Sequence, residues 1–186
     1  MEPTAILDAC VLYPAPLRDF LMHLALLDLF RARWTEEIHA EWIRNVLANR
    51  PDLRTEQLMR TKELMNVHAR DSVVTGYENL TETLILPDVN DCHVLAAAIH
   101  CNANFIVTFN LKDFPVVALQ QFGVTAIHPD DFILSLFDID AERVHNAAER
   151  QRKTLKNPPK SKNEYYETLA GNGLVRTVNK LRQNFS

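Results

Sequence analysis

The stretch that decides the fold spans residues 86–114 and reads LPDVNDCHVLAAAIHCNANFIVTFNLKDF. Asp88 favours the N-cap of a helix, the apolar residues after it recur at helical spacing, and Asn102 is typical of a helix end. Phe105–Thr108 is a dense run of aromatic and β-branched residues, which predicts a buried strand. A helix followed closely by a buried strand indicates an α/β protein with a parallel sheet.

The same alternation continues on both sides of this stretch. Short apolar runs at Thr4–Leu7 and Phe30–Trp34 predict two earlier strands, and Val124–Ile127 predicts a later one. Helical patterns lie between them, one of which begins after a Thr35 N-cap. Right-handed crossovers place the C-terminal ends of parallel strands on one edge, where open α/β sheets carry their sites. The sequence therefore predicts a short parallel sheet with helices on both faces.

Length and composition exclude several classes of protein. The chain has 186 residues, of which 47% are hydrophobic and 24% charged, enough for one substantial core. No apolar run approaches the ~20 residues that a membrane span needs, and the N-terminus has no signal-peptide pattern. The three cysteines are too few for a disulfide framework. We therefore expect a cytoplasmic protein without a membrane anchor.

Charge divides the chain near residue 140. Residues 1–140 carry 10 Lys and Arg against 20 Asp and Glu, whereas residues 141–186 carry 10 against 4. We expect residues 1–140 to form the α/β domain and residues 141–186 a small basic helical extension. The basic segment is either a solvated helical face or a surface for an anionic partner. Its candidate binding residues are Arg150, Arg152, Lys153, Lys156, Lys160 and Lys162.

Four acidic residues fall where this topology brings strand ends together. Asp8 ends the first predicted strand, and Glu41 lies in the helix that follows the second. Asp91 lies in the first turn of the helix that begins near Asp88, and Asp113 follows the strand of the quoted stretch. Adjacent carboxylates repel one another unless a cation joins them, and Mg²⁺ or Mn²⁺ prefers carboxylate and water oxygens. Such a site can orient a phosphate and lower the pKa of a water, which phosphodiester hydrolysis needs.

Each acidic residue also has a simpler structural explanation. Asp88 and Asp91 resemble an N-cap and a first-turn acid, Glu41 could face solvent, and Asp113 could cap the next helix. Asp8 is the hardest to explain in this way, because a carboxylate at the end of a buried strand needs a partner. The joint placement of the residues therefore favours a site more than any single residue does.

The order and spacing of these residues resemble the acidic motifs of PIN domains. The resemblance covers about residues 4–138 and rests on Asp8, Thr35 to Glu41, Leu86 to Asp91 leading into Val94–Ala98, and Ile106–Phe114. The segments Leu155–Pro159 and Gly173-Leu174 are similar to the C-terminal extension of one branch of VapC-like toxins. The resemblance implies a three-layer α/β/α fold and a Mg²⁺- or Mn²⁺-dependent ribonuclease. It further implies the toxin of a toxin–antitoxin pair, commonly a homodimer inhibited by a small protein antitoxin.

By position, the resemblance assigns the catalytic acidic cluster to Asp8, Glu41, Asp91 and Asp113. It implies that Asp8 and Asp91 hold the principal metal ion. Glu41 and Asp113 would ligate it through water or hold a second ion, with Asp88 as an accessory. The basic segment would then meet phosphates of the RNA substrate or an acidic partner, without selecting a sequence.

Three departures from the family pattern leave other functions open. The family often has a hydroxyl residue and then asparagine after its first aspartate, whereas this chain has Ala9 and Cys10. A basic residue often follows the third acid, where Cys92 stands here. A catalytically degenerate PIN-like module that binds RNA or serves as a scaffold is therefore the main alternative. An aspartyl phosphotransfer protein is less favoured, because Cys10 stands where a haloacid-dehalogenase-like phosphatase needs a second acid.

The histidines of the quoted stretch do not predict a zinc site. His93 and His100 lie seven residues apart on the predicted helix. Two helical turns separate them by about 10 Å, which is too far to share one zinc ion. We therefore interpret both as ordinary helix residues.

Overall fold

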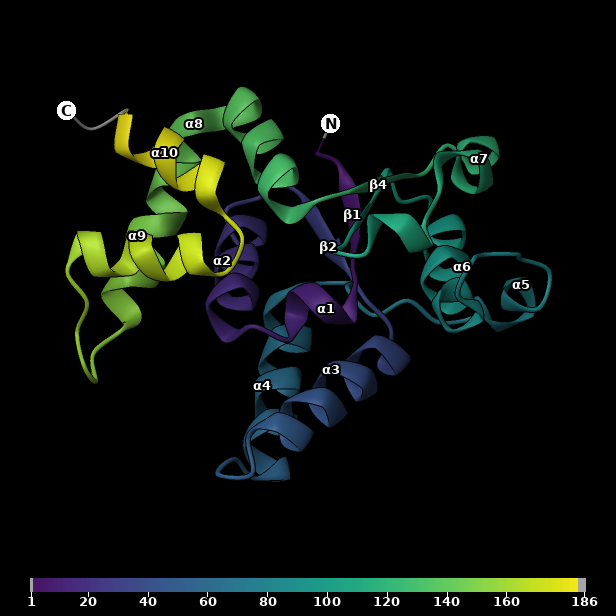
Figure 1. Cartoon of the computed structure of the whole chain (residues 1–186), viewed down its shortest axis with the longest axis horizontal. Helices are drawn as coiled ribbons and strands as arrows, with labels where there is room; N and C mark the ends of the chain where they lie inside the picture. Colours follow the sequence, from purple (N-terminus) through teal and green to yellow (C-terminus); the bar gives the residue numbers. More distant parts are fainter. Residues whose placement is uncertain (1, 184–186) are drawn as a thin grey trace.

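The computed structural model describes residues 2–183 and confirms the α/β class, with helices on both sides of a parallel sheet (Figure 1). Within these residues one four-stranded sheet has the order β2-β1-β3-β4, and every neighbouring pair is parallel. Its strands are β1 (Thr4–Leu7), β2 (Arg31–Arg33), β3 (Phe105–Val107) and β4 (Thr125–Ile127). All four predicted strands are thus confirmed, with β2 at an edge.

The strand register sets two polar residues side by side at the C-terminal edge. Ile6 of β1 pairs with Ile106 of β3, and both side chains are fully buried. The Asp8 amide then donates to the carbonyl oxygen of Val107 at 3.1 Å, one residue beyond the end of β1. Asp8 and Thr108 therefore lie next to each other, each directly after the last residue of its strand.

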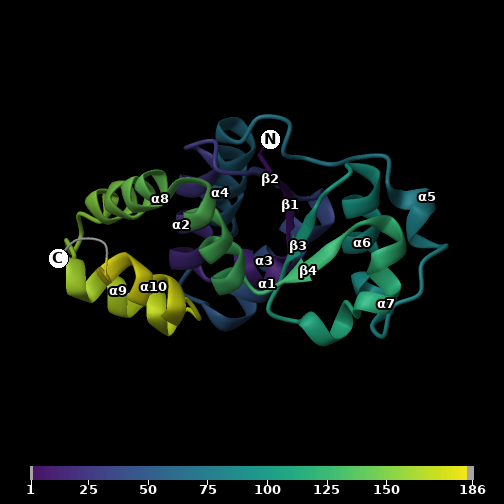
Figure 2. The same cartoon turned by 90° about the horizontal axis from the view of Figure 1, so that it is seen from above.

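Helices cover the two faces of the sheet in separate groups. Figure 2 shows α5, α6 and α7 on one side, and α2 and α8 on the other. The helices of the α/β region are α1 (Ala9–Leu12), α2 (Ala15–Ala25), α3 (Glu36–Asn49), α4 (Thr55–His68), α5 (Glu78–Thr81), α6 (Cys92–His100) and α7 (Val116–Leu119). Short 3₁₀ turns cover Val89–Asp91, Leu111–Asp113 and Gln120–Phe122.

Two helix starts differ from the sequence-based expectation. Helix α1 was not predicted, and it begins because the Asp8 carboxylate accepts a hydrogen bond from the amide of Ala9 at 2.7 Å. Asp88 caps the 3₁₀ turn rather than a longer helix, so α6 begins only at Cys92. Thr35 caps α3 as expected, accepting from the amide of Ile38 at 3.0 Å.

Three further helices form the C-terminal part: α8 (Pro129–Thr154), α9 (Lys162–Gly171) and α10 (Val175–Gln183). Helix α8 crosses residue 140 with one non-helical residue, Asp140, whose carboxylate accepts from the amide of Arg143 at 3.0 Å. Helix α8 packs on α2, and α10 packs on α8 and α9. The division of the chain at residue 140 stays a prediction. Among the described residues, no helix has both the length and the apolar content needed to cross a membrane.

Candidate active site

Asp8 is a buried carboxylate whose oxygens all have partners. Only 4% of the residue is exposed. One oxygen accepts from the amide of Ala9, and the other accepts from the Thr108 hydroxyl at 2.7 Å and the Cys10 thiol at 3.2 Å. Such bonds offset the cost of keeping a charged group out of water and fix its direction. Asp8 is thus a carboxylate of fixed direction, just beyond the C-terminal end of β1.

Thr108 supplies the hydroxyl that the chain lacks at Ala9. It follows β3, is fully buried, and also accepts from the amide of Asn110 at 3.0 Å. Sequence reasoning missed this residue, because its contact with Asp8 joins positions 100 residues apart. One signal in the sequence could have found it. Thr108 ends the predicted strand Phe105–Thr108, and Asp8 ends the predicted strand Thr4–Leu7, so in a parallel sheet both lie at the same edge.

Cys10 acts as a hydrogen-bonding group and not as a thiolate. Burial raises the pKa of its thiol to about 12, and the negative charge of Asp8 acts in the same direction. Its sulfur also accepts from the amide of Phe109 at 3.3 Å. The asparagine expected at this position is therefore replaced by a neutral group that still contacts Asp8.

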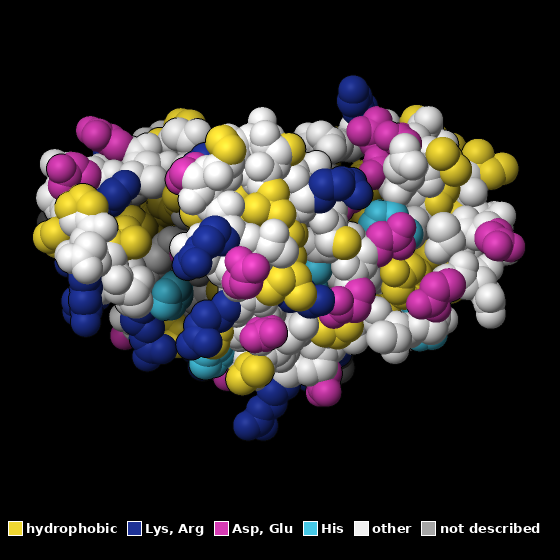
Figure 3. Space-filling view, turned by 90° about the horizontal axis from the view of Figure 1, so that it is seen from below, with side chains coloured by type: hydrophobic (Ala, Val, Ile, Leu, Met, Phe, Trp, Pro, Cys, Tyr) yellow, Lys and Arg dark blue, Asp and Glu magenta, His cyan; other side chains and the backbone are white. Residues whose placement is uncertain are grey.

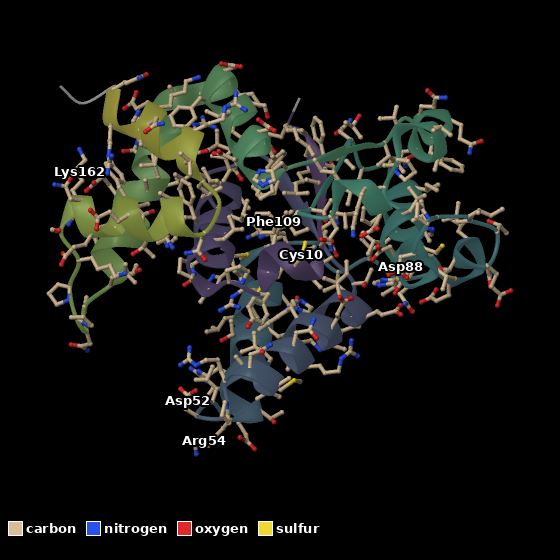
Figure 4. The ribbon with its side chains drawn as sticks, viewed as in Figure 1. Cys10, Asp52, Arg54, Asp88, Phe109 and Lys162 are labelled. Atoms are coloured by element: carbon tan, nitrogen blue, oxygen red, sulfur yellow. The ribbon has the colours of Figure 1, made fainter. Side chains whose placement is uncertain are left out.

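A cavity of about 700 Å³ lies between α3 and the start of α6. Asp8 does not line this cavity, but its charge acts on Asp91 and Glu41, which do. Five carboxylates, three amides and one guanidinium are among the groups that line it: Glu37, Glu41, Asp88, Asp91 and Asp113, then Asn45, Asn90 and Asn110, and Arg44. Figure 4 shows Cys10 at the end of β1 and Asp88 toward α6. The fold therefore brings the acidic residues singled out in the sequence into one region.

The closeness of these acids appears in their pKa values. Burial, the largest cause, and the charges of four neighbouring carboxylates together raise the pKa of Asp91 to about 7; the four are Asp8, Asp88, Asp113 and Glu41. The pKa of Glu41 is also raised, first by burial and then by Asp8. Neighbouring carboxylates that raise one another's pKa repel one another when ionised. A cation bound between them would be favoured, because it offsets this repulsion.

His93 is a second residue that sequence reasoning missed. It is buried in the first turn of α6 and lines the cavity, with Nδ1 3.6 Å from Glu37 Oε2 and Nε2 3.9 Å from Glu41 Oε2. Burial lowers the pKa of its imidazole, against the opposing effect of Glu37 and Asp8. The residue is thus part of the wall of the acidic cavity and not an ordinary helix residue.

The donor set fits a hard divalent cation. Among residues 2–183, no three His, Cys, Asp or Glu side chains stand close enough to enclose a metal ion by themselves. Mg²⁺ usually takes only one or two carboxylates and keeps several waters, so it does not require such a group. The raised pKa of Asp91 is the electrostatic sign that such a charge would be bound favourably.

The six basic residues of the C-terminal segment fall into three groups. Arg152 donates to Glu149 at 3.0 Å and to the carbonyl oxygen of Lys160 at 3.2 Å, and Lys160 Nζ donates to Thr168 at 2.6 Å. Lys162 is exposed, with its Nζ 5.8 Å from the centre of the Tyr166 ring. The remaining three are Arg150, Lys153 and Lys156. Their side chains are exposed and form no hydrogen bond or ion pair within the described part of the chain.

The charged groups are unevenly distributed over the molecule. Figure 3 shows the face seen from below, where the left half, on the side of the C-terminal helices, carries most of the Lys and Arg in view. Several Asp and Glu side chains stand on the right half, on the side of α5 to α7. Other Asp and Glu side chains lie among the Lys and Arg on the left half, so the uneven distribution in this view is mainly one of Lys and Arg.

Comparison with known proteins identifies the family. Residues 4–112 match the PIN domain model, and residues 129–183 match the model of the VapC50 C-terminal domain. A Mycobacterium tuberculosis protein named "Putative ribonuclease VapC50" is 52% identical over 52 residues, which are 28% of this chain and 31% of that protein. The match thus spans about a third of the relative's length, and no solved structure matches the chain. The chain belongs to the PIN domain family, and a VapC50-type C-terminal domain follows its PIN domain.

Proposed function

We propose that the protein is a Mg²⁺- or Mn²⁺-dependent endoribonuclease, and the toxin of a toxin–antitoxin pair. The observation that carries the proposal is the acidic cavity, in which burial and four neighbouring carboxylates bring the pKa of Asp91 to about 7. The family, and the name of the relative from M. tuberculosis, support the same activity. The VapC50-type C-terminal domain supports the toxin role and a small antitoxin as partner. Cytoplasmic location and a homodimer stay predictions.

The acidic residues would have distinct roles. Asp8 and Asp91 would hold the ion, with Glu41 and Asp113 acting through water or at a second ion and Asp88 as an accessory. When bound, the ion supplies Lewis-acid stabilisation of the phosphate and lowers the pKa of the attacking water. The protein holds Asp8 in one direction through the hydroxyl and thiol beside it. A carboxylate fixed in this way would hold the ion without reorganisation during the reaction.

The departures from the family pattern are compatible with activity. Thr108 provides a hydroxyl for Asp8 in place of the residue missing at Ala9. Cys92 is buried, and its thiol donates to the carbonyl oxygen of Leu84 at 3.6 Å, so it removes none of the acidic groups. These observations favour an active enzyme over a degenerate scaffold.

RNA phosphates would be contacted by the exposed cations of the C-terminal domain. Arg150, Lys153 and Lys156 have no hydrogen bond or ion pair among the described residues, which leaves their charge available to a ligand. Arg152 and Lys160 instead bind groups of the same domain. We therefore propose that the first three bind RNA and that the last two stabilise the domain, whereas RNA binding by Lys162 stays a prediction.

The test is the chemistry of cleavage on a pool of mixed-sequence RNA. We expect cleavage with Mn²⁺, none with EDTA, and none of a DNA pool of the same sequences. Attack by water yields no 2′,3′-cyclic phosphate, whereas attack by the RNA's own 2′-hydroxyl does. Cleavage in EDTA, or cyclic phosphate ends, would contradict the proposal. A folded protein that neither cleaves the pool nor binds Mn²⁺ would support the scaffold alternative.

A further inference from the structure

The C-terminal domain contacts the active-site turn through one aromatic ring, that of Phe109. Gly173, in the turn between α9 and α10, approaches this ring so closely that a Cβ added there would lie 3.0 Å from Phe109 Cε1. The ring also meets the His128 imidazole edge to face, with centroids 5.1 Å apart. Figure 4 shows Phe109 between the loop before α10 and Cys10. The ring is therefore enclosed by the C-terminal part on one side and by the site on the other.

The backbone around Phe109 belongs to the hydrogen-bond network that holds Asp8. Its amide donates to the sulfur of Cys10 at 3.3 Å, which in turn donates to Asp8. The preceding residue, Thr108, donates its hydroxyl to Asp8, and the following residue, Asn110, donates its amide to that hydroxyl. The chain then enters the 3₁₀ turn that ends at Asp113. A shift of Phe109 would therefore move groups at two of the proposed catalytic acids.

The other side of the contact is firmly anchored. The Asp130 carboxylate is buried and accepts from the amides of Arg176 and Thr177, at 2.9 and 2.8 Å, in the first turn of α10. Gln151 of α8 links Tyr165 of α9 to the backbone of α2, through bonds of 2.7 and 2.9 Å. The Gly173 turn lies between α9 and α10, so it is held in place from both sides.

We propose that Phe109 is a positioning residue, through which the C-terminal domain sets the geometry of the turn 108–113. This inference rests on the proposed nuclease function. Close-packed interiors transmit small displacements, and a displacement of about 1 Å near reacting groups can cost a hundredfold in rate. The C-terminal domain thus contributes to turnover as well as to binding.

The glycines of the chain provide a matched set of variants. Gly173→Ala adds a methyl group against Phe109 at a residue with φ +88°. Gly123→Ala has comparable backbone strain, at φ +68°, but meets no atom within 4 Å. Gly171→Ala lies near the same turn and also meets no atom within 4 Å. Comparing the three separates the contact with Phe109 from backbone strain and from general effects on the turn.

Two measurements are made on each variant: amide hydrogen exchange, and Mn²⁺-dependent cleavage of the mixed-sequence RNA pool. We expect Gly173→Ala to speed exchange across residues 108–113 relative to β1, and to lower kcat about tenfold with KM within about twofold. Both controls should match the wild type. If Gly173→Ala speeds exchange across residues 108–113 but leaves kcat unchanged, the proposal is overturned. It is also overturned if Gly123→Ala changes exchange and kcat as much as Gly173→Ala does.

A second background tests the contact itself and guards against misfolding. Phe109→Leu shortens the side chain at the contact, so the penalty of Gly173→Ala on kcat and exchange should shrink several-fold in the double variant. An undiminished penalty would show that Phe109 does not transmit the effect. If the wild type fails to cleave RNA with Mn²⁺, the proposed function fails, whereas the exchange measurement still decides whether the C-terminal domain positions the turn.

Discussion

At the scale of single residues, the site depends on how Asp8 is held. The carboxylate lies in the interior, and a hydroxyl, a thiol and an amide donate to it. The Thr108 bond is the shortest of the side-chain contacts to Asp8, at 2.7 Å. Short hydrogen bonds to an ionised oxygen are among the stronger ones in proteins. Thr108 should therefore influence catalysis although it touches no substrate.

Thr108→Val removes this hydroxyl and keeps the shape of the side chain. We expect kcat for RNA cleavage to fall about ten- to a hundredfold, because Asp8 loses its fixed direction. Thr125→Val is the matched control, since Thr125 lies exposed on β4. Steady-state kinetics with Mn²⁺ makes the comparison. Equal activity of the two variants would contradict the role given to Thr108.

Asp91→Asn tests the repulsion within the acidic cavity. The pKa of Asp91 is raised from 3.8 to about 7 in the folded protein, so the folded state binds more protons than the unfolded state between these values. This group's contribution to the stability of the metal-free protein is present below pH 4 and is lost as the pH rises through 7. Removing the charge should therefore stabilise the metal-free protein at pH 8.

Because Asp91 is only half-buried, solvent screening limits the gain to about 1 kcal/mol, or a rise in Tm of about 2–4 °C. The advantage over the wild type should disappear near pH 4. Saturating Mn²⁺ should raise the Tm of the wild type more than that of the variant. Thermal denaturation with and without Mn²⁺ measures all three effects. A variant less stable than the wild type at pH 8 in EDTA would contradict the account.

The residues of the site differed in how well the sequence could predict them. Asp8, Asp91 and Asp113 were predictable, because each follows a strand or precedes a helix at the edge where parallel strands end. Glu41 was predictable from its place in the helix that follows β2. Thr108 and His93 were not, because their roles depend on contacts with Asp8 and with α3 that spacing along the chain does not encode. Local sequence patterns thus predicted the acidic residues. Thr108 and His93 contact these residues only because segments distant in the sequence pack together.

At the scale of elements, the cap of α10 comes from another helix. Its first-turn amides bind the carboxylate of Asp130 on α8, so no capping residue is visible next to α10 in the sequence. The sequence predicted a helical extension over residues 141–186, but not what holds its last helix against the rest of the protein. Helix α1 escaped prediction for a related reason, since its four residues depend on the Asp8 cap.

Asp130→Ala should loosen the C-terminal domain. The substitution leaves amides of α10 without their acceptor, and we expect a loss of about 1–3 kcal/mol in the free energy of unfolding. Asp138→Ala is the matched control, because Asp138 is exposed and meets Lys180 only at the surface, at 3.4 Å. It should cost less than about 0.5 kcal/mol. Urea denaturation measures both, and equal losses would contradict the capping role.

At the scale of the whole molecule, the acidic excess of residues 1–140 and the basic excess of residues 141–186 have different explanations. The acidic excess of residues 1–140 includes the carboxylates of the cavity, where a cation would offset part of it. The basic excess of residues 141–186 is partly used within the protein, because Arg176 pairs with Asp131 and Lys180 with Asp138. The remaining exposed cations supply the charge that we assign to RNA binding.

The salt dependence of RNA affinity tests this assignment. Lys153→Gln/Lys156→Gln removes two exposed cations. The slope of log K against log salt should become shallower by about 1.4, since each phosphate contact on a single strand contributes roughly 0.7. Arg31→Gln/Arg70→Gln removes equal charge beside a different cavity, near the start of β2, and should leave the slope unchanged. Equal slopes for both double variants would refute a specific role for the C-terminal cations.

The most direct test of the central claim joins metal binding to cleavage at the acidic cavity. Calorimetric titration with Mn²⁺ and cleavage of the RNA pool are measured on the wild type, Asp8→Asn and Asp91→Asn. The account predicts that each variant folds, binds Mn²⁺ at least tenfold more weakly, and cleaves RNA at least a hundredfold more slowly than the wild type. Metal-dependent cleavage at the wild-type rate in either variant would show that the reaction takes place elsewhere.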